Sequence, residues 1–193
     1  RGTVAEIALR ERFDSHRLIE EFMITANVAA AEALEKKSLP CMYRIHDQPS
    51  PTKVAGLSDA LETIGLKIAK GQVMQSSIFN QILTKAKGGP FERMVQELVL
   101  RSQAQAEYSP DNIGHFGLAL RRYCHFTSPI RRYSDLLVHR ALIRGGRMGD
   151  GALETDHKDF AEMGQHLSFT ERRAAAAERT AVDRFTTQYL ADR

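Results

Sequence analysis

The spacing of apolar residues predicts a mostly helical protein. Over most of the chain they recur every three or four positions, which is typical of helices that pack by one face. This spacing predicts helices over about 15–37, 53–66, 76–87, 91–107, 128–143 and 157–190. Strand-like stretches are brief, at 3–9, 41–45 and 115–127. We therefore expect an α+β fold, predominantly helical, with a small and incomplete antiparallel sheet.

The first predicted helix carries a broad apolar stripe. Its members are Leu18, Phe22, Ala26, Ala29 and Ala33, widened by Ile19, Met23, Ala30 and Leu34. Glu20 and Asn27 are seven residues apart and share another face. A carboxylate and an amide at this spacing are candidates for a polar contact with a ligand, and ordinary surface positions are the alternative.

Residues 128–146 carry clear helix boundaries. Ser128 is a good N-cap, Pro129 fits the first helical position, and Gly145 and Gly146 close the far end. This helix is expected to bury the apolar positions of one face, Ile130, Tyr133, Leu137 and Ala141.

Arg131 and Arg132 would then lie in the first turn, where the positive end of the helix dipole disfavours cations. Two arginines at that end are consistent with a bound anion, and a guanidinium binds phosphate through two hydrogen bonds. An intrahelical ion pair is the alternative, because Asp135 follows Arg131 by four residues and Arg132 by three.

The composition indicates a single globular domain. The chain has 193 residues, of which 42% are hydrophobic and 26% charged, so it can bury a core. No apolar run is long enough to cross a bilayer and the start shows no signal peptide. Cys41 and Cys124 stand alone in the sequence, which favours free thiols. We expect a cytoplasmic protein with no membrane association and no obligate protein partner.

Positive charge gathers near the middle of the chain. The net charge is only +3, yet one stretch has a single acidic residue, Asp135, among seven arginines: Arg121, Arg122, Arg131, Arg132, Arg140, Arg144 and Arg147. Such a patch is the electrostatic footprint of a phosphate-backbone binder, with a solvated basic face as the alternative.

The last predicted helix places a carboxylate among apolar side chains. Glu178 falls on the stripe formed by Phe160, Met163, Leu167, Ala174, Ala181, Phe185 and Tyr189. An inward-facing carboxylate needs a partner. A structural salt bridge and a functional site both satisfy that need.

Four stretches together resemble a known family. They are HFGL at 115–118, YCHFTSPIRRYSDLLVHR at 123–140, SHRLIEEFMITANVAAAE at 15–32 and TERRAAAAER at 170–179. They resemble the ribonuclease II superfamily of processive 3′-to-5′ RNB exoribonucleases, and most closely its bacterial ribonuclease R branch. The resemblance implies that residues 1–193 are the C-terminal part of a single RNB catalytic domain, without its cold-shock and S1 domains.

The resemblance also implies roles for individual residues. Arg131 corresponds to the arginine that contacts the scissile phosphate, with Ser128, Arg132 and Tyr133 beside it. Glu178 corresponds to a carboxylate near the 3′-terminal nucleotides. Glu20, or Glu21 if the register differs by one, corresponds to a carboxylate that contacts the RNA, where a ribose 2′-OH can donate to it. Asn27 and His115 are further RNA-contact candidates.

The family's chemistry needs Mg²⁺, held by clustered aspartates. This sequence has no D-x-D or D-D motif. We therefore expect the metal ligands to lie upstream, and we expect the isolated chain to bind single-stranded or structured RNA without degrading it. A non-catalytic RNA-binding module and a helical scaffold for protein partners remain as alternatives.

Overall fold

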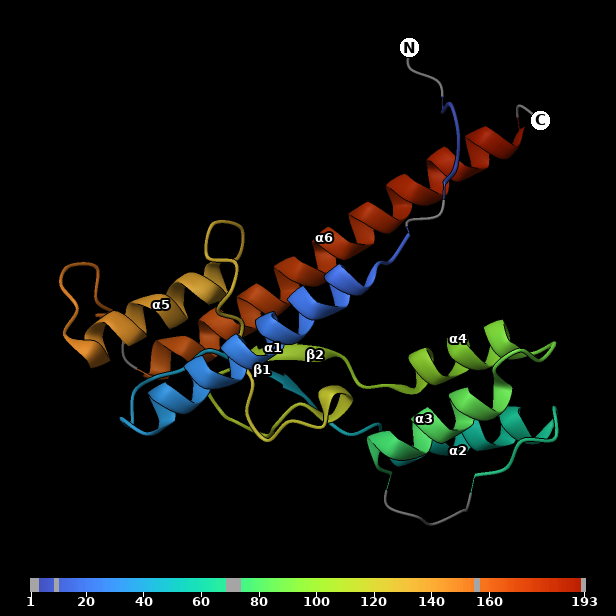
Figure 1. The fold of residues 1–193 in the computed structure, drawn as a ribbon, viewed down its shortest axis with the longest axis horizontal. Coiled ribbons are helices and arrows are strands. Elements are labelled where there is room, and N and C mark those ends of the chain that lie inside the picture. Colours follow the sequence, from blue (N-terminus) through green and yellow to red (C-terminus); the bar gives the residue numbers. More distant parts are fainter. Residues whose placement is uncertain (1–3, 9–10, 69–73, 155–156, 192–193) are drawn as a thin grey trace. The chain divides into compact units, whose positions relative to one another are not determined.

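The computed structural model describes residues 4–8, 11–68, 74–154 and 157–191. Of the described residues, 60% are helical, and these residues form one two-stranded antiparallel sheet, which confirms the predicted fold class. Figure 1 shows the elements, which are α1 (Asp14–Glu35), β1 (Tyr43–His46), α2 (Pro51–Glu62), α3 (Ser76–Ala86), α4 (Glu92–Ser102), β2 (Ala106–Ser109), the 3₁₀ helix η1 (Phe116–Leu118), α5 (Tyr133–Gly146) and α6 (His157–Ala191).

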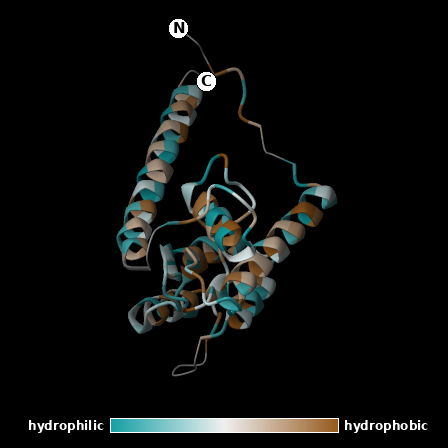
Figure 2. Cartoon of the chain, turned by 90° about the vertical axis from the view of Figure 1, so that its left-hand side faces the viewer, coloured by the Kyte–Doolittle hydropathy of each residue, from teal (hydrophilic) through white to brown (hydrophobic). Residues whose placement is uncertain are grey.

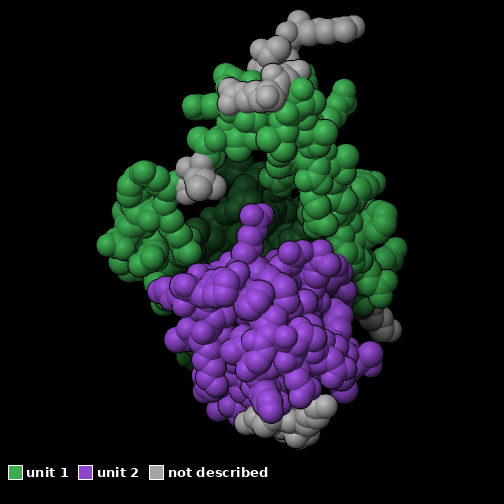
Figure 3. All heavy atoms as spheres, turned by 90° about the vertical axis from the view of Figure 1, so that its right-hand side faces the viewer, with its two compact units in different colours: residues 1–42, 108–110, 124–193 green, residues 43–107, 111–123 purple. Residues whose placement is uncertain are grey.

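The chain forms two compact units, coloured separately in Figure 3. Unit 1 comprises residues 1–42, 108–110 and 124–193, and unit 2 comprises residues 43–107 and 111–123. Each unit therefore draws on segments that are far apart in the sequence.

In unit 1, α1 packs against α5 through its C-terminal half only. Ala30 and Leu34 are buried as predicted, whereas Leu18 and Phe22 are exposed. The predicted stripe is thus wrong for the first turns of α1. Leu18, Ile19 and Phe22 are each more than half exposed, so this apolar face is open to solvent.

The long helix α6 shows the same division. Phe160 is fully buried, and Gly164 lets the helix approach β2, because a Cβ on Gly164 would lie 2.5 Å from the carbonyl oxygen of Tyr108. Ser168 fixes this contact by accepting the Tyr108 backbone N–H at 2.9 Å. Beyond it the predicted stripe is exposed at Ala174, Ala181 and Phe185, while Tyr189 is half-buried. Figure 2 shows apolar and polar residues interspersed along this helix.

In unit 2, α2 and α3 both pack on α4. Their shared core contains Leu57, Leu61, Ile68, Met74, Phe79, Ile82, Ala86, Val95 and Val99. These helices confirm three of the predicted elements, with shifted ends.

The helix predicted over 91–107 ends earlier, at Ser102. Gln103 turns to an extended conformation, and its carbonyl oxygen accepts the Lys53 Nζ at 2.7 Å. The next carbonyl, that of Ala104, lies 2.9 Å from His46 Nε2. These side chains from elsewhere in unit 2 bind backbone oxygens that a continuing helix would have used, and β2 follows.

The strands predicted over 115–127 are also reduced. The described residues there form η1 and two isolated bridges, which join His115 to His46 and to Leu120. Of the strand predicted over 3–9, residues 4–8 are not in a strand and the remainder lies outside the described residues. Along the part of the chain that is described, no helix is long and apolar enough to span a membrane.

Candidate functional site

The segment before α5 is a turn and not the first turn of a helix. The backbone N–H groups of Arg131 and Arg132 both donate to the carbonyl oxygen of Ser128, at 3.3 and 3.1 Å. Arg132 is extended and occupies the N-cap position of α5. The predicted start at Ser128 is therefore wrong. The predicted helix end at Gly145 and Gly146 is nearly correct. Helix α5 includes both glycines, and Arg147 caps it in a left-handed conformation.

The side chain of Asp135 is fully buried and binds both ends of this turn. Its Oδ1 accepts the Ser128 backbone N–H at 2.8 Å, and both of its oxygens bind the Arg132 guanidinium, each at 2.8 Å. The predicted ion pair is thus confirmed for Arg132. The guanidinium of Arg132 already holds a carboxylate, so a phosphate would have to share it.

The residues before this turn, 124–128, are held by α1 and α5. Phe126 donates its backbone N–H to Asn27 Oδ1 at 2.9 Å, and its carbonyl oxygen lies 2.9 Å from His139 Nε2. Cys124 donates its thiol to the Asn27 carbonyl oxygen at 3.3 Å. Asn27 is buried by these contacts, which give it a structural part in the site. Its direct contact with RNA stays a prediction.

The top of the turn faces solvent. Ile130 is 102% exposed and Tyr133 is 48% exposed, so the prediction that both are buried is wrong. Leu137 and Ala141 are buried as predicted. The Arg131 side chain is exposed and forms no hydrogen bond or ion pair with any described residue. The structure thus leaves Arg131 available to an anion from outside the chain.

The basic patch seen in the sequence is only partly available. Arg140 donates to the carbonyl oxygens of Gly151 and Ala152, at 3.1 and 3.2 Å, and Arg144 donates to that of Leu153 at 3.3 Å. These arginines fix the glycine-rich link after α5. Spacing in the sequence cannot distinguish such internal clamps from surface cations.

Glu20 lies on the exposed half of α1 and pairs with Arg12. Glu20, Arg12 and Met23 help to line a cavity of about 540 Å³ beside the first turns of α1. Glu21, the alternative contact residue, is exposed as well. An RNA hydroxyl would meet Glu20 in competition with the Arg12 guanidinium.

Glu178 is exposed on α6, and the prediction that it faces inward is wrong. It forms no ion pair with a described residue. Helix periodicity is misleading here, because the residues around Glu178 on α6, from Arg172 to Arg184, are all exposed.

His115 belongs to unit 2 and has a structural environment. Its Nδ1 accepts the Leu118 backbone N–H at 3.2 Å, and its ring lies 5.1 Å from that of His46. Burial, with smaller contributions from the positive fields of His46 and Arg44, lowers the pKa of His115 to about 4. The imidazole is therefore neutral at pH 7. Its contact with RNA stays a prediction.

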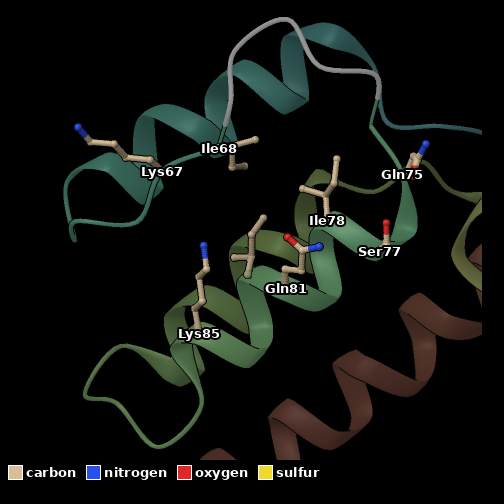
Figure 4. Close-up of a pocket in the computed structure, with 8 residues that line it drawn as sticks. Lys67, Ile68, Gln75, Ser77, Ile78, Gln81 and Lys85 are labelled. Atoms are coloured by element: carbon tan, nitrogen blue, oxygen red, sulfur yellow. The ribbon is translucent and has the colours of Figure 1, made fainter.

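One cavity in unit 2 is lined by residues that no sequence pattern connects. Figure 4 shows Lys67 and Lys85 at one side of a space of about 350 Å³. Its wall also includes Gln75, Ser77 and Gln81, over an apolar floor of Ile68, Ile78 and Ile82. Lys67 lies in the connection after α2 and Lys85 lies on α3, eighteen positions further along the chain, so no sequence motif links them.

The described residues do not form a metal centre. They contain no group of three or more His, Cys, Asp or Glu side chains that could hold a metal ion. The residues that the structure describes therefore do not fit Mg²⁺ as a resident ion.

Comparison with known proteins decides the family. The RNB domain model matches residues 1–145, three quarters of the chain. The chain belongs to the RNB domain family. Ribonuclease R of Aquifex aeolicus is 44% identical over 183 residues, covering 95% of this chain and 26% of the relative. Ribonuclease R of Escherichia coli is 38% identical over 198 residues, covering 98% of this chain and 24% of the relative.

Two solved structures have a similar fold. Mycoplasma genitalium RNase R in complex with ribose-methylated single-stranded RNA has a TM-score of 0.85 at 28% identity, over 95% of this chain and 29% of that chain. Yeast Ssd1, a pseudonuclease, has a TM-score of 0.68 at 25% identity, over 82% of this chain and 20% of that chain. The resemblance seen in the signature residues is thus confirmed. The chain spans about a quarter of the length of the curated relatives it matches.

Proposed function

We propose that this chain is the phosphate-binding part of a cytoplasmic 3′-to-5′ exoribonuclease that hydrolyses single-stranded RNA and releases 5′-nucleotides. Membership in the RNB family and the relatives named ribonuclease R support an exoribonuclease. The observation that carries the role of this part is the exposed Arg131, whose neighbour Arg132 is held by Asp135.

Arg131 would act on the charge of the reacting phosphate. In the hydrolysis water adds to phosphorus, the bond from phosphorus to the 3′-oxygen of the preceding nucleotide breaks, and negative charge grows on the phosphoryl oxygens. A guanidinium binds two such oxygens in a fixed geometry. Its stabilisation of that charge is worth ~3–4 kcal/mol by analogy with a lost oxyanion donor.

The other candidates would contact the substrate around this phosphate. Ser128 and Tyr133 flank the turn that carries Arg131, and Glu20 would accept a ribose 2′-OH. The Mg²⁺ expected for this chemistry would need ligands other than the described residues, because these form no metal cluster.

Binding of RNA by the purified chain tests this proposal. We expect a fluorescent single-stranded RNA to bind in low salt, and Arg131→Ala to weaken binding about tenfold or more, the loss expected for a charged hydrogen bond. Arg131→Lys should restore part of the affinity, because an ammonium keeps the charge without the planar fork. Arg184→Ala is the matched control, since Arg184 is an exposed arginine on α6. Equal behaviour of Arg131→Ala and Arg184→Ala would contradict the role of Arg131.

A non-catalytic RNA-binding module is the second candidate, and the likeness to a pseudonuclease favours it. Both candidates expect the chain alone to leave RNA intact. They differ for the longer protein that contains this part: an exoribonuclease shortens a 5′-labelled RNA when Mg²⁺ is added and stops when it is chelated, whereas a binding module retains the RNA at full length in both conditions.

A further inference from the structure

The buried carboxylate of Asp135 is the most heavily bonded side chain near Arg131. It accepts four hydrogen bonds, from the Ser128 N–H, from two guanidinium nitrogens of Arg132, and from the Ser134 hydroxyl at 3.1 Å. A buried ionised carboxylate is costly unless its oxygens are satisfied in this way. Burial alone would raise the pKa of Asp135, yet the bonds from Arg132 and Ser128 hold it below its ordinary value. The group is therefore a carboxylate at neutral pH.

These bonds reach both ends of the exposed turn. Ser128 begins the turn and Arg132 ends it, so one carboxylate fixes the two residues between which Arg131 projects. Asp135 itself lies in the first turn of α5, where a negative charge is favoured by the helix dipole. The anchor is thus rigid, while the residues it holds are at the surface.

The approach to the turn is fixed as well. Asn27 and His139 bind the backbone N–H and carbonyl oxygen of Phe126, and the His139 ring stacks on the Phe126 ring at 4.3 Å. A cation held by a rigid backbone loses less conformational entropy when it binds than one on a loose loop. Such preorganisation is also what makes a fixed cation effective toward a transition state.

We propose that Asp135 is a positioning residue for RNA: by holding Ser128 and Arg132 it presents Arg131 to the phosphate, and Arg132 serves as its partner and not as a separate phosphate ligand. This inference rests on the proposed function of Arg131 and adds how that residue is set in place. Asp135 itself touches no substrate in this scheme.

A double-mutant cycle tests the proposal in the purified chain. Asp135→Asn keeps the size of the side chain but replaces one carboxylate oxygen by an N–H₂ group. That group cannot accept the hydrogen bonds that Ser128 or Arg132 donates to this oxygen. We expect it to weaken binding of a single-stranded RNA about as much as Arg131→Ala does, roughly tenfold. The slope of log binding constant against log salt concentration should also decrease in magnitude by about 0.7, the value for one phosphate contact on a single strand. In the Arg131→Ala background the same change should have no further effect on affinity or on slope.

Controls separate positioning from folding. Ser134→Ala removes a bond to the same carboxylate but leaves the bonds to Ser128 and Arg132, so it should bind RNA like the parent. If Asp135→Asn fails to fold, Arg132→Lys takes its place in the cycle, since it keeps the charge and loses the two-pronged bond. A purely structural role predicts a loss of affinity that is equal with and without Arg131.

The outcomes are distinct for the two proposals. Arg131→Ala without effect on binding ends the proposed function, and the positioning role fails with it. An effect of Arg131→Ala combined with parent-like binding of Asp135→Asn, or with additive losses in the double variant, overturns the positioning role alone.

Discussion

The imidazole of His46 accepts the backbone N–H of Gly117 at its Nδ1, over 2.8 Å, and its Nε2 faces the Ala104 carbonyl oxygen at 2.9 Å. This pair of contacts places the acceptor on Nδ1 and the proton on Nε2. His115, which also accepts a backbone N–H, lies beside it. The histidines of unit 2 therefore tie together the backbone around η1 through their ring nitrogens.

Acid should destabilise the protein through His115. The unfolded residue takes up a proton near pH 6.5 and the folded one near pH 4, so between these values the unfolded state binds more protons. We expect the contribution of His115 to the free energy of unfolding to be fully present above pH 6.5. It should fall by ~2–3 kcal/mol as the pH drops to 4, a figure that solvent screening of the imidazole reduces. Urea titrations at several pH values measure it. His115→Gln, which cannot titrate, should flatten this part of the profile, and an unchanged profile would assign the acid sensitivity to other groups.

Two helix-interior glycines should respond oppositely to alanine. Gly164→Ala places a Cβ 2.5 Å from the Tyr108 carbonyl oxygen and should destabilise unit 1 by ~1–3 kcal/mol. Gly56→Ala on α2 meets nothing within 4 Å and should stabilise by ~0.5–1 kcal/mol. Melting temperatures of the two variants provide the comparison. A parent-like melting temperature for Gly164→Ala would mean that α6 can move away from β2 at little cost.

Ile130 and Leu137 should contribute very differently to stability, although the sequence pattern treats them alike. Ile130→Ala should change the free energy of unfolding by less than ~0.5 kcal/mol, because the side chain is fully exposed. Leu137→Ala removes a buried side chain and should cost ~2–5 kcal/mol. Chemical denaturation of both variants distinguishes them, and similar losses would show that Ile130 is covered in solution.

Both cysteines should be unreactive in the folded protein. Cys41 and Cys124 are buried, and the hydrogen bond with Cys124 together with burial raises the pKa of Cys41 well above its ordinary value. We expect no iodoacetamide adduct by mass spectrometry in native buffer at pH 7 and two adducts in urea. Rapid labelling without denaturant would indicate that this part of unit 1 opens readily.

Glu178→Ala should leave the fold intact and strengthen RNA binding. The side chain is exposed and has no described ion-pair partner, so the melting temperature should stay within the change expected of a surface substitution. If Glu178 lies near RNA phosphates, as the family resemblance implies, its removal relieves repulsion and lowers the dissociation constant. Measurements of the melting temperature and of the RNA dissociation constant of Glu178→Ala check this prediction. A large fall in the melting temperature with weaker binding would restore the buried-pair interpretation.

The amino-acid sequence is sufficient to assign the class of fold and the family. Helical spacing identifies all six α-helices, because periodicity follows from burying one face of a helix. The long match from Tyr123 to Arg140 identifies the family, since a signature of this length depends on residue identity and not on the shape of the fold. The sequence also indicates the ion pair of Arg132 with Asp135, because spacing allows Asp135 to pair with either Arg131 or Arg132.

Tertiary structure decided what each of these residues faces. The same periodicity marks Leu137 and Phe185, yet only Leu137 is buried, because burial depends on whether another element packs there. The arginines of α5 look equivalent along the chain, but Arg140 binds the carbonyl oxygens of a link that folds back onto it. At Ser128 the chain forms a turn before α5, and the buried Asp135 accepts the Ser128 N–H and binds Arg132 at the other end of that turn. Sequence spacing records which contacts a helix can make with itself, whereas competition from distant groups for the same backbone atoms exists only in the folded chain.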